Sequence, residues 1–349
     1  MFKKIEIERF RGIKKASIDG FKQINLFLGE NNCGKSTLLE ALFLANGLSN
    51  PTLSIVVNKL RSYHKTNLND LELNFYNLDS TLPIKVLLQN EEKRDLTIRL
   101  YEKNNRDISF DDSNVSIASN KLESEYGLMF NFKINDNQYN SKLQFNLKEQ
   151  QTTIEFPKQH GKSSRYVDPF ISAYIPPNYA FLGNKEALEN ILKNKDENFI
   201  VEGLKCIEPR VEGFAFVNEV VLVDIGKEKR IPINMMGDGT RKIFSILTHL
   251  YVCKNGVLLI DEISNGLHYS VMGKLWKVII KAAIKNNIQL FITTHDYDSI
   301  KGLRDTALGK FDEQVAVFSL LKTSEDELKA LHYSLESVDY SINQEIEIR

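Results

Sequence analysis

The sequence is poor in cysteine, with three in 349 residues, and their spacing is not that of a metal site. So few thiols provide no disulfide framework, which favours an intracellular, reducing compartment. The chain also lacks a run of 18 apolar residues and a signal-peptide pattern, so we expect neither a membrane-spanning helix nor a membrane partner. These absences predict a cytoplasmic protein.

An excess of charge of either sign is absent too. The 45 basic and 46 acidic residues give a net charge of −1, which argues against a protein whose whole surface binds nucleic acid. A local basic groove remains compatible with this balance. The sequence contains no heptad pattern and no internal repeat, so we expect no long coiled coil. A hydrophobic content of 42% is sufficient for a sizeable globular core.

A glycine-rich segment matches the phosphate-binding pattern G-x-x-x-x-G-K-[ST] in full. An alternating apolar stretch at 24–28 runs into it, and a helix-periodic stretch at 35–46 leaves it. A strand, a glycine loop and a helix N-terminus together aim backbone N–H groups at an anion. In such a loop Lys35 reaches the β- and γ-phosphates, and Ser36 binds Mg²⁺. The residues that we expect to bind the nucleotide here are Gly29, Glu30, Asn31, Asn32, Cys33, Gly34, Lys35, Ser36 and Thr37.

Four apolar residues at 257–260 are followed by Asp261 and Glu262. This pattern is typical of a buried parallel strand, and ligands bind at the carboxyl ends of such strands. Asp261 then fits the acid that holds Mg²⁺, and Glu262 fits the base that polarises the attacking water. The alternative is a strand that merely ends in a polar turn. The phosphate loop in the same chain favours the catalytic interpretation.

A second strand of this kind, 290–292, ends in Thr293, Thr294 and His295. The residues between the two strands, 267–285, have helical spacing, and this βαβ pattern predicts a parallel sheet. At its edge His295 can hydrogen-bond a γ-phosphate oxygen and so distinguish bound ATP from ADP. The alternative for a lone histidine is a surface or core position.

Two glycines stand just before a helical stretch that begins near residue 240. Gly237, Asp238 and Gly239 therefore open a helix, and the N-terminus of a helix attracts anions. Because the first loop already holds the phosphates, a second anion site makes sense if it faces the nucleotide of another subunit. The alternative is a simple turn and helix cap.

The middle of the chain has a different pattern. Residues 71–156 contain several alternating stretches with a hairpin signal at 135–137, which predicts an inserted antiparallel β region. Residues 184–206 have helical spacing, and 214–233 return to strand alternation. The fold class expected from the whole chain is α/β, with a central, mostly parallel sheet and short helices.

In this order, the four functional segments resemble the ABC-type ATPases of the RecF, SMC and OLD group. The resemblance is greatest to the OLD-like ATPases of bacterial antiphage systems. It covers residues 1–45 and 210–300, and implies one ABC-type ATPase domain over 1–349. That domain would be built from 1–46 and 210–349, with 47–209 as an inserted β and helical subdomain. The segments that carry the resemblance are 7–13, 29–42, 261–269 and 293–295.

The resemblance also implies a head-to-tail dimer that encloses two ATP molecules with Mg²⁺. Residues 237–239 would be the signature loop that contacts the γ-phosphate held by the opposite subunit, and 265–267 would link the two sites. Most transporters and SMC proteins have a serine where Gly237 stands, which weakens this contact. The glutamine of the Q-loop is not fixed by any motif. The candidates for it are Gln89, Gln144, Gln150 and Gln151.

The function expected is that of an ATPase switch, in which ATP closes a homodimer or a higher homo-oligomer and hydrolysis opens it. The resemblance implies an associated effector in antiphage defence, such as a nuclease or toxin. The segment after His295 is too short for a nuclease domain, so we expect the effector to be another protein. The alternative is a RecF-like DNA-repair ATPase that clamps DNA directly, with affinity that falls steeply with salt. A scaffold that binds ATP without hydrolysing it is a third interpretation, which Glu262 argues against.

Overall fold

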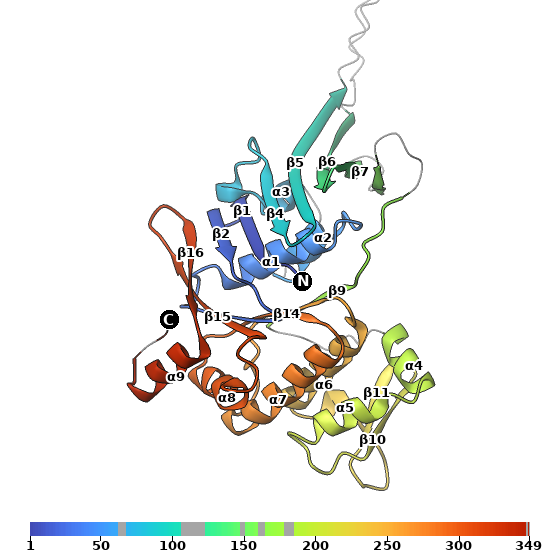
Figure 1. Ribbon diagram of the computed structural model, residues 1–349. Helices are drawn as coiled ribbons and strands as arrows, with labels where there is room; N and C mark the ends of the chain where they lie inside the picture. Colours follow the sequence, from blue (N-terminus) through green and yellow to red (C-terminus); the bar gives the residue numbers. More distant parts are fainter. Residues whose placement is uncertain are drawn as a thin grey trace, which may run out of the picture.

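One large mixed sheet runs through the protein (Figure 1). The structure, a computed structural model, describes residues 1–61, 68–105, 123–146, 151–159, 165–177, 185–346 and 348. Within these residues the sheet has 13 strands in the spatial order β8-β7-β6-β5-β4-β1-β2-β16-β15-β3-β14-β13-β9. The strands are β1 (Lys4–Phe10), β2 (Ile13–Asp19), β3 (Ile24–Leu28), β4 (Ile84–Gln89), β5 (Lys93–Asn105), β6 (Glu123–Ile134), β7 (Asn137–Asn146), β8 (Gln151–Gln159), β9 (Ser172–Ile175), β13 (Val257–Ile260), β14 (Gln289–Thr293), β15 (Val315–Lys322) and β16 (Glu327–Tyr333).

Five neighbouring strands, from β9 to β15, are parallel and form the half of the sheet that we call the core sheet. The strands β3, β13 and β14 are buried along their whole length, because each is an almost continuous apolar run with helices on both faces. On one face Phe27 and Phe291 pack with α1 (Lys35–Asn46) in one core cluster. On the other face Leu26 and Ile292 pack with α6 (Asp238–Val252) and α7 (Tyr269–Lys285). The predicted α/β class with a parallel central sheet is confirmed.

The strands β4 to β8 form an antiparallel arm that continues the sheet beyond β1 (Figure 1). The arm confirms the antiparallel region predicted for 71–156, and its β6–β7 turn has Asn135 at a φ of 52°. Arg94 of the arm is fully buried and donates to the last carbonyls of α1, those of Ala45 and Asn46 (3.1 Å each). It also pairs with Asp168, so the arm is fixed to α1 and to the segment before β9.

The helices after the arm cover the face of the core sheet opposite α1 (Figure 1). None of the described helices exceeds the 17 residues of α7, so this part of the chain contains no coiled coil, as expected. None of them is long and apolar enough to cross a membrane. The remaining elements are α2 (Leu53–Lys59), α3 (Leu68–Glu72), α4 (Lys185–Lys193), α5 (Glu197–Leu204), α6 (Asp238–Val252), α7 (Tyr269–Lys285), α8 (Tyr297–Ala307), α9 (Leu335–Asn343), the 3-10 turns η1 (Tyr76–Leu78) and η2 (Ile233–Met235), and a small sheet of β10 (Gly213–Val217), β11 (Val220–Asp224) and β12 (Ile231–Pro232).

The division into two ATPase halves around an insert at 47–209 stays a prediction. Strands from that middle segment join the large sheet at two places, β4 beside β1 and β9 beside β13. The middle segment therefore supplies part of the same sheet that carries the candidate site.

Candidate nucleotide site

The loop between β3 and α1 has the backbone of a phosphate cradle. Gly29 has a φ of 146°, and a Cβ built on it lies only 2.7 Å from the Cys33 Sγ and 2.8 Å from the Leu320 carbonyl of β15. Glycine is therefore the residue that lets the loop close against the neighbouring strand. Asn32 and Gly34 also have positive φ values, 65° and 108°, and Gly34 caps α1. Such alternation turns successive N–H groups toward one concavity, which suits phosphate.

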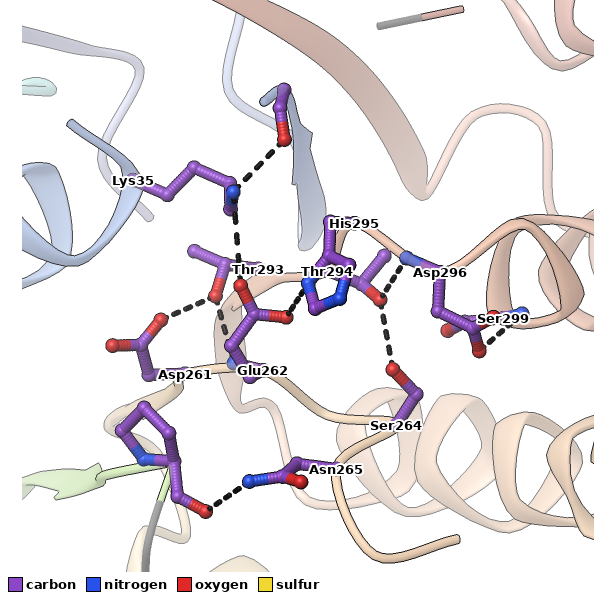
Figure 2. A network of polar contacts seen from close by, with 12 residues as sticks. Lys35, Asp261, Glu262, Ser264, Asn265, Thr293, Thr294, His295, Asp296 and Ser299 are labelled. Carbon is purple, nitrogen blue, oxygen red and sulfur yellow. Dashed lines mark hydrogen bonds and ion pairs between the residues drawn. The ribbon is translucent and has the colours of Figure 1, made fainter. Parts of the chain in front are cut away.

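Lys35 is the first residue of α1, and its ammonium lies inside the loop. Its Nζ donates to the carbonyls of Gly29 (2.9 Å) and Glu30 (3.0 Å), and only 5% of the residue is exposed. The same Nζ is 3.7 Å from the Glu262 Oε1 (Figure 2). The structure thus joins the phosphate loop to the end of β13, two sites that are far apart in the sequence.

Asp261 follows β13 directly and is held by the strands on both sides. Its Oδ1 accepts from the Thr293 Oγ1 of β14 (2.5 Å), and its Oδ2 accepts from the Tyr174 hydroxyl of β9 (3.0 Å). Burial, together with the negative charge of Asp261, raises the pKa of Tyr174 well above its usual value, so this hydroxyl remains a neutral donor. Asp261 itself is 1% exposed, and its carboxylate is fixed in one orientation.

Glu262 lies between Lys35 and His295 (Figure 2). Its φ of 49° turns the chain sharply, and its N–H donates to the Thr293 Oγ1 (2.8 Å). Its Oε2 is 2.7 Å from the His295 Nδ1, while the His295 side chain is 51% exposed. The expectation that the ends of β13 and β14 bring these side chains together is met, because the strands are parallel neighbours.

The loop at 237–239 contacts a loop other than the phosphate loop. A Cβ built on Gly239 meets Ile207, the Gly266 carbonyl and Leu267, so this loop packs on the 265–267 loop of the same chain. Gly237, whose Cβ position is open, caps the N-terminus of α6, and Asp238 is exposed and pairs with Arg241. Asn265 donates to the Pro177 carbonyl (3.1 Å), and His268, expected as a surface residue, is exposed and caps α7.

The sequence prediction missed an ion cluster around Glu40 of α1. Glu40 is 1% exposed and accepts from the Arg11 Nη1 (2.8 Å) and the Arg61 Nε (2.7 Å). The Arg61 Nη2 also reaches the Thr37 Oγ1 (3.1 Å), so the hydroxyl of Thr37 faces this cluster. Arg11, Glu40 and Arg61 come from separate parts of the chain. The sequence shows that Glu40 lies on the helix after the glycine loop, but it does not show that the two arginines pair with it.

Lys242 on α6 is a second residue that the sequence did not single out. Its Nζ is 3.4 Å from the carbonyls of Asp261 and Pro176, two long contacts for a buried ammonium. Burial lowers the pKa of Lys242 to about 8, against the opposing effect of the Asp261 and Glu262 charges. Its place near the start of α6, directly after the polar Thr240 and Arg241, gave no local signal that it is buried.

We expect Lys242→Met to lower the kcat for ATP hydrolysis about tenfold with little change in nucleotide affinity, because the turn that presents Glu262 loses a nearby positive charge. Melting temperature should not fall, since methionine fills a similar volume without a charge to desolvate. Steady-state phosphate release and nucleotide titration measure the two effects. Lys242→Arg is the control and should keep most of the rate. Wild-type kcat in Lys242→Met contradicts this role.

The donor set fits Mg²⁺ bound together with phosphates. The part of the chain that the structure describes contains no cluster of three or more His, Cys, Asp or Glu side chains suited to a metal. The hydroxyl of Ser36 and the carboxylate of Asp261 are oxygen donors, which Mg²⁺ prefers, and this ion commonly completes its coordination shell with substrate oxygens and water.

The four candidates for the Q-loop glutamine lie in or near the arm in the sequence. Gln89 and Gln144 lie on the arm strands β4 and β7, whereas Gln150 and the side chain of Gln151 lie outside the described residues.

Comparison with known proteins agrees with this geometry. Residues 24–300 match the family described as "AAA domain, putative AbiEii toxin, Type IV TA system". The chain belongs to this family. The match runs from the first residue of β3 to the start of α8, so it contains both the phosphate loop and the Asp261–His295 cluster.

One curated relative aligns with nearly the whole length of this chain, and another with less than half of it. A protein of Helicobacter pylori named "ATP/GTP phosphatase" is 26% identical over 370 residues, which cover 99% of each chain. "Uncharacterized protein MJECL10" of Methanocaldococcus jannaschii is 26% identical over 45% of this chain and 70% of its own. Among solved structures, an SMC head bound to the C-winged helix domain of ScpA has a TM-score of 0.52 at 12% identity, covering 97% of this chain and 99% of that one. The family and the fold together identify a P-loop ATPase with the fold of an SMC head.

Proposed function

We propose that this AAA-family ATPase is a nucleotide switch, in which two copies close head to tail around two ATP molecules and hydrolysis reopens them. The observation that carries the proposal is that the two loops have different neighbours within one subunit. The phosphate loop, Glu262 and His295 form one cluster, whereas 237–239 packs on 265–267 and leaves Gly237 and Asp238 exposed. A site that needs both sets of groups is completed by a second copy.

In the proposed hydrolysis Glu262 orients and polarises the attacking water, and His295 holds the Glu262 carboxylate by its Nδ1 contact. Lys35 and the N–H groups of the glycine loop bind the phosphates and counter the charge that develops on them. Asp261 and Ser36 would hold Mg²⁺, which supplies further neutralisation of that charge. Because Thr293 contacts both Asp261 and Glu262, one hydroxyl fixes the relative position of the two acids.

We further propose that the switch controls a separate effector, a nuclease or toxin of an antiphage system. The family description, which names a toxin of a toxin–antitoxin system, supports this class of function. The name of the Helicobacter pylori relative supports hydrolysis of GTP beside ATP. A ligand can shift the open and closed states only by binding one of them more tightly, so the effector must sense the closed dimer differently from the open one.

A mixed-dimer experiment tests the composite site. Lys35→Ala removes the lysine of the phosphate cradle, and Gly237→Arg places a bulky side chain on the opposite face, at a position with a φ of −60° where a Cβ meets nothing within 4 Å. Each variant alone should be inactive, while an equimolar mixture should regain up to about a quarter of the wild-type rate, since half the dimers are mixed and each has one intact site. Wild-type activity of Gly237→Arg alone, or a mixture as inactive as its parts, overturns the proposal.

A further inference from the structure

A groove on the helical side of the protein lies outside the nucleotide site. It has a volume of about 800 Å³ and is formed by α5, the end of α6 and the second half of α7. Its apolar floor consists of Phe199, Tyr251, Val278 and Ala282, of which the first three are only partly buried against the main core. Half-buried apolar side chains gathered in one hollow are typical of a binding surface.

The rim of this groove is positively charged. Lys254, Lys281 and Lys285 line it, and all three are exposed. The two acids on the facing wall are already engaged: Asp196 accepts from the Tyr251 hydroxyl (2.8 Å), and Glu202 pairs with Lys205 (2.8 Å). Among the described residues, none of the three rim lysines forms an ion pair. The groove therefore offers an excess of positive charge beside an apolar floor.

The sequence of α7 explains this charge. The helix has lysines at 274, 277, 281 and 285 and contains no acidic residue. At spacings of three and four residues these lysines share one face of the helix, and Val278 and Ala282 lie on the adjoining face. The second half of α7 thus presents a cationic stripe directly beside an apolar one.

We propose that this groove binds an acidic amphipathic helix of the effector protein. Its apolar floor follows α7 from Val278 to Ala282, about 6 Å or one helical turn, and Phe199 and Tyr251 extend it sideways, so it can receive the i and i+4 apolar side chains of such a helix. Glutamates or aspartates flanking that face would pair with Lys254, Lys281 and Lys285. A nucleic acid fits less well, because its sugar-phosphate backbone would not use the apolar floor.

The position of the groove fits control by nucleotide. The helix α6 begins at the 237–239 loop and α7 begins just after the 265–267 loop, whereas the groove lies at the far ends of both helices. A change in the angle between α6 and α7 when the dimer closes would alter the width of the groove. The identity of the occupant as the effector rests on the proposed switch; the binding chemistry of the groove does not.

The test uses a fluorescein-labelled synthetic peptide of about 16 residues, with leucines on one helical face and glutamates on both flanks. We expect binding by the full-length protein with a Kd on the order of 10 µM in anisotropy titrations at physiological salt. Lys281→Glu with Lys285→Glu should weaken binding about tenfold or more. The matched control, Lys274→Glu with Lys277→Glu, makes the same charge change on the same helix outside the groove, and should weaken it less than about threefold.

Val278→Glu, a substitution at a partly exposed position, should abolish binding, and a cooperative melting transition measured alongside shows that the protein is still folded. Absence of peptide binding, or equal loss in the groove and control pairs, overturns the inference. Tighter binding of a single-stranded oligonucleotide that is lost with the same lysines assigns the groove to nucleic acid and also overturns it. The peptide titrations are repeated with the Lys35→Ala protein in the absence of nucleotide. Peptide binding by this variant shows that the groove binds its ligand independently of the nucleotide switch, so failure of the proposed function and failure of the groove can be told apart.

Discussion

Glu262→Gln is expected to slow ATP hydrolysis by about 100-fold to 10,000-fold while ATP still binds, because the amide cannot accept the proton of the attacking water. The amide also keeps the size of the side chain and a hydrogen bond to His295, so the site remains assembled. A substituted enzyme that binds ATP but does not hydrolyse it should accumulate as the closed dimer. Phosphate release measures the rate, and light scattering after gel filtration with ATP measures the mass.

His295→Gln is the useful comparison for this prediction. It removes the partner of Glu262 but leaves the carboxylate, so its effect on the rate should be smaller than that of Glu262→Gln. A Glu262→Gln protein that releases phosphate at the wild-type rate would show that another group orients the water. A slow protein that stays monomeric with ATP would separate catalysis from dimer closure.

Lys35→Ala should weaken binding of ATP by at least about 100-fold, because the phosphates lose a charge-assisted donor in a site from which water is largely excluded. The lysine is almost fully buried, and its Nζ already points into the loop through its contacts with Gly29 and Glu30. Calorimetric titration with a non-hydrolysable ATP analogue gives the affinity. Hydrolysis should fall in parallel, since no nucleotide is held beside Glu262.

The melting temperature of nucleotide-free protein provides the control for this substitution. Lys35 is 3.7 Å from Glu262, and its loss leaves that carboxylate with His295 as its neighbour, so a modest change in stability is expected. Lys35→Arg keeps the charge but is longer than the loop accommodates, and should also bind poorly. Unchanged ATP affinity in Lys35→Ala contradicts the assignment of the phosphate loop.

The parts of the site that the sequence predicts are those carried by local patterns. The glycine loop, the acids after 257–260 and the polar residues after 290–292 each follow a buried strand directly, so their side chains lie at one edge once the strands are parallel. The sequence did not predict the contacts of Tyr174, Lys242 and Arg61 with the site, because their partners lie far away in the sequence. Tyr174 reaches Asp261 only because the four-residue strand β9 pairs with β13 at the end of the sheet.

For the fold, the long alternating strands of the arm and the βαβ unit at 257–292 were predictable from their periodicity. The order of the strands was not. The strand β15 lies between β3 and β16, and its Leu320 carbonyl closes the space behind Gly29, yet nothing in its sequence indicates that neighbour. Such pairings depend on which apolar faces fit together in three dimensions, and a single sequence does not contain that information in a local form.

Arg94 connects the arm to the helix that follows the phosphate loop. Its guanidinium donates to the last carbonyls of α1, the helix that begins at Lys35. Asp168 pairs with the same guanidinium and accepts from the Ser49 N–H (2.7 Å). An α-helix is a stiff element, because hydrogen bonds connect its successive turns. Arg94 therefore couples the position of the arm to α1, the helix that begins at the phosphate loop.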